Sequence, residues 1–122
     1  MKALVWILRL TFLASLALGI GLWMGHGYAF LQVHMWLGFI VTFALLLIVL
    51  LSFLARVRPA LPLISLLWAI ALPFIGIAQL RMMPGPNHWV VRVVHLLLGL
   101  GAIGLGEALA KRAAQGRNRY AK

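Results

Sequence analysis

The residues of this chain best suited to chemistry are its histidines, and two of the four stand in the same short motif. His34 opens HMWLG and His95 opens HLLLG, so each histidine is followed four residues later by a glycine, Gly38 or Gly99. In a helix this spacing places the histidine and the glycine on one face. A neutral imidazole is a common metal ligand, and a glycine beside it leaves room for a flat group. The repeated motif predicts a ligand site shared by two helices.

The glycines that follow His95 also form the pattern GLGAIG at residues 99–104, which fits the fingerprint of a dinucleotide-binding turn. Such a turn needs a strand before it and a helix N-terminus after it. Here the pattern lies inside an apolar run, so we interpret it as close helix packing, with Gly101 and Gly104 as plain helix contacts. Steps of three and four residues predict one continuous stripe along this helix: His88, Arg92, His95, Gly99, Ala102 and Gly106.

The composition indicates the solvent in which these helices fold. Of 122 residues, 65% are hydrophobic and only 10% are charged, and the mean hydropathy is +1.07. A water-soluble chain of this length could not bury so much apolar surface, so we expect a lipid bilayer. The net charge of +10 does not indicate nucleic acid, because the basic residues stand at the ends of apolar runs. The absence of cysteine excludes disulfides and thiolate chemistry.

The apolar runs predict an all-α fold, an integral membrane four-helix bundle with up-down-up-down topology. About 20 residues cross the hydrocarbon layer, and four runs reach that length, at about 4–24, 30–55, 61–80 and 89–110. They form one membrane domain over 1–122, with 111–122 as a basic tail. Of the eleven Lys and Arg residues, all but Arg81 and Arg92 fall on the side of the termini. This bias predicts that both termini are cytoplasmic (N-in/C-in), in the plasma membrane, that is, the inner membrane of a bacterium.

In such a bundle the second and fourth helices run parallel, so His34 and His95 lie at comparable depth and can face each other. Two imidazoles across an apolar gap suit the two axial positions of a haem iron. We therefore predict one haem b near the outer leaflet, with His34 and His95 as axial ligands and Gly38 and Gly99 as clearance for the macrocycle. Arg92 would pair with a propionate.

Two further histidines lie toward the outer surface. His88 is on the predicted stripe, where it would contact a propionate, a quinone or the two axial histidines. His26 lies between Gly25 and Gly27, and we expect it in an exposed loop. Because no histidine lies in the inner half of a helix, a second haem is not expected.

Four helices with two H-x-x-x-G motifs in parallel helices resemble the small four-helix b-type membrane cytochromes. The similarity to superoxide oxidase and cytochrome b561-like proteins is one of architecture only. The resemblance implies electron transfer through a bis-His haem, to or from a quinol in the membrane or an extracytoplasmic redox partner protein. It leaves open whether the chain is an enzyme, for example as a component of a quinone-linked oxidoreductase.

Other interpretations are a cofactor-free structural subunit of a membrane complex, whose His95 stripe would face another chain, and a copper-binding membrane protein. Soft methionine sulfurs with imidazole suit copper, and the residues for such a site would be Met82, Met83, His26 and His88. A small multidrug-type transporter is disfavoured because the first helix has no carboxylate.

The charged residues inside the spans have simpler explanations. Glu107, the one acidic residue, is predicted to pair with Lys111 one turn further along the same helix. Arg9 is expected to extend its side chain toward the inner interface.

Overall fold

The computed structural model describes residues 1–120, which form α1 (Lys2–Trp23), a short 3-10 helix η1 (Tyr28–Phe30), α2 (Leu31–Leu54), α3 (Ala60–Ala78) and α4 (His88–Tyr120). Within these residues there is no strand. Four helices are long and apolar enough to cross a membrane. The predicted all-helical membrane fold is confirmed, and the bounds of the first three helices lie close to the predicted ones. The four apolar helices indicate an integral membrane protein.

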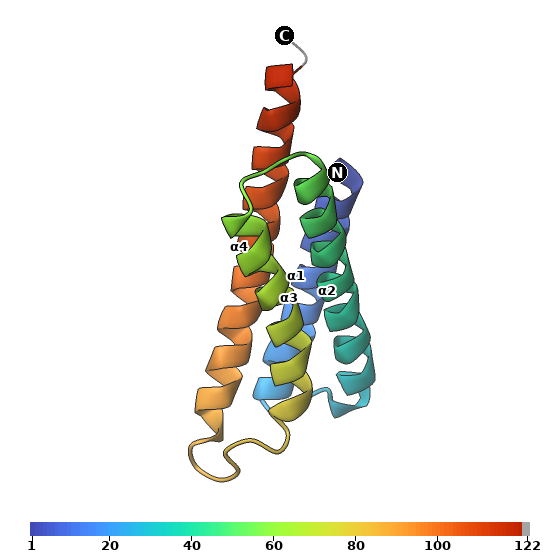
Figure 1. Cartoon of the computed structure of the whole chain (residues 1–122). Coiled ribbons are helices and arrows are strands. Elements are labelled where there is room, and N and C mark those ends of the chain that lie inside the picture. Colours follow the sequence, from blue (N-terminus) through green and yellow to red (C-terminus); the bar gives the residue numbers. More distant parts are fainter. Residues whose placement is uncertain (121–122) are drawn as a thin grey trace.

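The helices run alternately along one bundle axis (Figure 1). The start of α1, the α2–α3 connection and the end of α4 lie toward one end, which we call the terminal end. The α1–α2 and α3–α4 connections lie at the other, which we call the hairpin end. Short connections allow only antiparallel neighbours. In addition, α2 packs directly against α4, and α1 also packs against α4.

The fourth helix is longer than predicted. The chain continues as helix through residues 111–120, so the expected separate basic tail is wrong for these residues, while 121–122 lie outside the described residues. At 1.5 Å per residue its 33 residues extend about 50 Å, more than the roughly 30 Å of hydrocarbon. It projects past the other helices at the terminal end (Figure 1). The segment has no proline, and Ala113 is buried there, so packing supports the extra turns.

The core lies along the middle of α2, where this helix meets the other three. Leu8, Leu45, Ile48 and Leu109 are fully buried in it. Gly106 permits the contact between α1 and α4, because a Cβ atom there would lie 2.3 Å from Leu8 Cδ2. Small residues have this function in membrane bundles, where close backbone approach replaces the hydrophobic effect.

The two off-stripe glycines of α4 differ from each other. The indole N–H of Trp68 donates to the Leu98 carbonyl at 2.8 Å, and a Cβ at Gly101 would lie 2.4 Å from the Trp68 ring. The predicted helix contact at Gly101 is therefore confirmed. The one predicted at Gly104 is wrong, because nothing lies within 4 Å of a Cβ atom built there.

The α1–α2 and α3–α4 hairpins repeat one burial pattern. Aligning Gly19 with Gly76 places the buried residues of α1 on buried residues of α3: Val5, Leu8 and Ser15 on Pro62, Ser65 and Leu72. Aligning His34 with His95 places four of the six buried residues of α2 on buried residues of α4: Val41, Leu45, Ile48 and Ser52 on Ala102, Gly106, Leu109 and Ala113. The two motif histidines therefore occupy equivalent positions in two similar halves.

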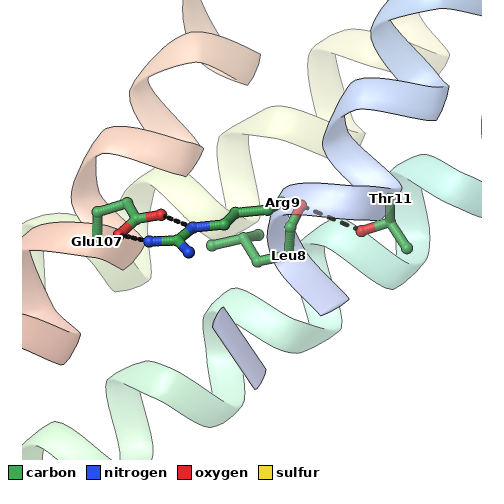
Figure 2. Close-up of polar contacts among 4 residues, drawn as sticks. All are labelled: Leu8, Arg9, Thr11 and Glu107. Carbon is green, nitrogen blue, oxygen red and sulfur yellow. Dashed lines mark hydrogen bonds and ion pairs between the residues drawn. The ribbon is translucent and has the colours of Figure 1, made fainter. Parts of the chain in front are cut away.

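The acidic residue pairs across the bundle, not along its own helix. Both oxygens of the Glu107 carboxylate accept hydrogen bonds from Arg9: one from Nε, the other from Nη2 at 2.8 Å. Figure 2 shows the Arg9 side chain reaching from α1 to α4 beside Leu8. The predicted pair with Lys111 is wrong, because a two-pronged guanidinium lies opposite the carboxylate where α1 and α4 approach closely. The Arg9 side chain is directed at this carboxylate on α4.

Candidate functional site

A cavity of about 320 Å³ opens among the four helices in the half nearer the hairpin end. Its volume lies within the range of small-molecule and cofactor sites, roughly 300–1,000 Å³. The wall is mostly apolar. All six residues predicted for the site line it: His34, Gly38, His88, Arg92, His95 and Gly99. The stripe on α4 therefore faces the interior of this chain's own bundle.

The imidazoles of His34 and His95 lie close to each other within this cavity. Their ring centroids are 6.2 Å apart, and the ring planes make an angle of 73°. A metal–imidazole bond is about 2.0 Å and the centroid lies about 1 Å beyond the nitrogen, so two imidazoles on opposite sides of one metal have centroids about 6 Å apart. The spacing of the two rings fits one metal ion held between them, as a bis-His haem requires.

Each imidazole rests against a glycine of the preceding helix, a feature that the sequence reasoning missed. A Cβ atom at Gly19 would lie 3.1 Å from His34 Cε1, and one at Gly76 would lie 3.0 Å from His95 Cε1. Any larger residue would push the ring toward the middle of the cavity. The available signal was weak: each of these glycines is followed by isoleucine.

The proton position on His34 follows from its hydrogen bonds. Its Nδ1 lies 2.9 Å from the Ser15 carbonyl oxygen and 3.2 Å from the Ser15 hydroxyl. Because a carbonyl oxygen only accepts, Nδ1 carries the hydrogen and donates it, which leaves Nε2 with a free lone pair. A backbone carbonyl on the other nitrogen is the usual way in which a ligating histidine is oriented.

His95 has no such partner. Its Nδ1 is buried and makes no hydrogen bond. Leu72 takes the place of Ser15 in the alignment of α3 with α1, so the α3–α4 half has no hydroxyl at the equivalent position. The two histidines therefore occupy equivalent positions, but only His34 has a hydrogen-bond partner at Nδ1.

The two motif glycines border different kinds of space. A Cβ atom at Gly38 would meet nothing within 4 Å, so this backbone faces open cavity. At Gly99 the same atom would meet Phe12 Cε2 at 3.5 Å, an ordinary van der Waals distance. A flat group therefore has open space beside Gly38 on α2, whereas the ring of Phe12 occupies part of the space beside Gly99 on α4.

Arg92 is a cation of the cavity without a protein anion. The one carboxylate side chain of this sequence, Glu107, is bound by Arg9. The Arg92 guanidinium lies 6.0 Å from the centre of the Trp23 ring on α1, a cation–π contact. Its charge is available to an anionic group from outside the chain, which fits the predicted propionate.

The two outer histidines have different surroundings. His88 lines the cavity, and its Nδ1 donates to the Met82 carbonyl at 3.1 Å. His26 is exposed and does not line the cavity, and the side chains of Met82 and Met83 are exposed as well. Among residues 1–120, no three His, Cys, Asp or Glu residues come together as a metal site. The geometry therefore offers the copper interpretation little support.

Comparisons with protein families, curated proteins and solved structures find no match for this chain. The class of the protein therefore rests on its own fold and cavity. It is a four-helix membrane bundle with two facing histidines in an apolar pocket.

Proposed function

We propose that this chain is a b-type membrane cytochrome that transfers electrons through one haem held between His34 and His95. The observation that carries the proposal is the pair of imidazoles at equivalent positions of two similar hairpins, with centroids 6.2 Å apart in a common cavity. Histidine in a membrane helix is costly and usually functional. A structural hydrogen bond would require neither the repeat nor the open space at Gly38.

The chain's own residues have separable functions in this proposal. The Ser15 carbonyl holds His34 in the tautomer that leaves Nε2 free. Gly38 leaves space for the macrocycle, and Arg92 and His88 line the cavity where propionates would lie. The haem supplies reversible one-electron chemistry. With histidine on both axial positions, electron transfer is favoured over binding of a substrate at the iron.

The proposed orientation follows from the basic residues. Lys2 begins α1, and Arg56 and Arg58 lie between α2 and α3, so they are toward the terminal end. Residues 111–120 at the end of α4 carry four more basic residues on the same side. The positive-inside rule assigns this end to the cytoplasm of a bacterial cell. The hairpin end, with the cavity, then lies near the outer leaflet. A quinol or an extracytoplasmic redox protein would exchange electrons there.

The alternative of a cofactor-free structural subunit receives less support. That interpretation required the stripe of His88, Arg92 and His95 to face another protein. Instead, the stripe lines a cavity within the chain itself.

The test is a reduced-minus-oxidised absorption spectrum of the purified protein, expressed with ample haem. We expect sharp b-type bands in the wild type and in His26→Ala, whose histidine lies outside the cavity. His34→Ala and His95→Ala should lose or alter the bands. A colourless wild type would overturn the proposal.

A further inference from the structure

The repeat of the two hairpins is broken at one polar position beside the histidines. Ser15 and Leu72 occupy equivalent buried places, each four residues before the glycine that supports an imidazole. Ser15 offers its carbonyl and its hydroxyl to His34 Nδ1. No polar atom reaches His95 Nδ1, although this nitrogen is buried. The structure therefore treats two otherwise equivalent ligands differently.

This difference changes how firmly each ring is held. His34 has its tautomer and its rotation defined by a hydrogen bond, and a histidine oriented in this way is a better ligand. His95 is oriented by packing, against Gly76 among other neighbours, without a hydrogen bond at Nδ1. When Nε2 of His95 binds a metal, the hydrogen on its Nδ1 has no acceptor. The metal-bound orientation of this ring is therefore less stabilised than that of His34, and its bond to the metal breaks more easily.

The cavity wall formed by α3 and α4 has a surface suited to an uncharged replacement ligand. Leu72, Pro73 and Leu96 form part of this wall and are apolar. An apolar wall favours a small uncharged molecule there, because the charge of Arg92 is paired with a propionate in the proposed haem site.

We propose that the two histidines are unequal ligands: His34, positioned by Ser15, is the permanent one, and His95 is exchangeable for a small uncharged diatomic molecule. This inference rests on the proposed haem. It adds to electron transfer a binding site for neutral diatomic ligands at the His95 side of the cavity.

The first test needs no haem. The protein, selectively labelled with ¹⁵N-histidine and reconstituted without haem, is studied by NMR of the imidazole nitrogens. We expect His34 to show a single tautomer with hydrogen on Nδ1, and His95 to show a mixture. Two equally fixed rings would overturn the inference, whatever the protein binds.

The second test uses carbon monoxide as the probe, added to the reduced, haem-loaded protein. We expect the wild type to bind it, with the bis-histidine spectrum replaced by that of a haem with one histidine and carbon monoxide. His95→Ala should retain haem and bind carbon monoxide more tightly, whereas His34→Ala should lose most of its haem. Equal haem loss in the two variants would overturn the inequality. A wild type whose b-type spectrum is unchanged by carbon monoxide would overturn the exchange of His95 and would still support the cytochrome proposal.

A hydroxyl in place of Leu72 should restore the symmetry. Leu72→Ser offers His95 Nδ1 a hydroxyl at the position that corresponds to the Ser15 hydroxyl, and we expect about fivefold weaker carbon monoxide binding, the value of one typical hydrogen bond. Val41→Ser is the matched control, because Val41 is also buried and lines the cavity, on α2 about two helical turns beyond His34. An equal effect of both variants, or no effect of Leu72→Ser, would contradict the inference.

Discussion

Gly76 lies so close to His95 that a single methyl group on its backbone would come within 3.0 Å of the imidazole Cε1. Gly19 has the same relationship to His34, at 3.1 Å. Each glycine thereby sets how far its imidazole extends into the cavity. The ligand site is thus built from four helices, although only two of them carry histidines.

We predict that Gly19→Ala and Gly76→Ala each displace an imidazole and weaken haem binding. Overpacking of this kind costs on the order of 1–3 kcal/mol, about tenfold or more in affinity. Haem titration of the purified variants measures the effect. Gly104→Ala is the control, because nothing lies within 4 Å of its added methyl group. Unchanged affinity in both test variants would show that the rings are not held by these contacts.

Gly38 provides a way to fill the cavity without disturbing the bundle. Because its Cβ would meet open space, we expect Gly38→Ala to be tolerated and Gly38→Leu to exclude a haem while the fold is kept. The haem-to-protein ratio and the thermal unfolding temperature separate the two effects. If Gly38→Leu retains a full haem content, the macrocycle does not lie against α2 at this residue.

Arg92 should raise the midpoint potential of the haem, because a nearby positive charge favours the reduced state. We expect Arg92→Gln to lower the potential by about 70 mV, taking about 10 Å between charges and an effective dielectric constant of about 20. Arg81→Gln is the control, since Arg81 is exposed and does not line the cavity. A redox titration with equal potentials for the two variants would place the haem away from Arg92.

We expect the ion pair of Arg9 and Glu107 to stabilise the bundle only when both side chains are present. Glu107→Gln leaves the Arg9 guanidinium without its carboxylate inside a membrane helix, so we expect a lower unfolding temperature. The double variant Arg9→Met with Glu107→Met should recover much of the loss, and haem binding should be little affected in both. Thermal unfolding in detergent tests this, and additive effects would show that the two side chains do not interact.

The proposed topology has a simple test because the chain has no cysteine. Asn87 in the α3–α4 connection and Gln115 in the projecting part of α4 are both exposed. We expect a membrane-impermeant maleimide to label Asn87→Cys in spheroplasts and Gln115→Cys only after the membrane is opened. The reverse pattern would place the hairpin end and its cavity on the cytoplasmic side.

The sequence by itself determined the four membrane helices and six of the residues that line the cavity. A long apolar run in lipid can adopt few structures other than a helix, because its backbone N–H and C=O groups must form hydrogen bonds with each other. The period of a helix is local, so the spacing from His88 to Gly106 already placed these residues on one face. The shared H-x-x-x-G spacing then pointed to His34 and His95 as a pair.

Only the tertiary structure decided what stands opposite these residues. The contacts of Gly19 with His34 and of Arg9 with Glu107 depend on the rotation and depth of one helix relative to another, which no local period encodes. Sequence reasoning therefore paired Glu107 with Lys111 on its own helix. It also ended α4 too early, since the basic residues after Ala110 look like a tail until Ala113 packs into the bundle. The same reason hides the inequality of the two histidines: it arises from Ser15 and Leu72, each on a different helix from the ring beside it.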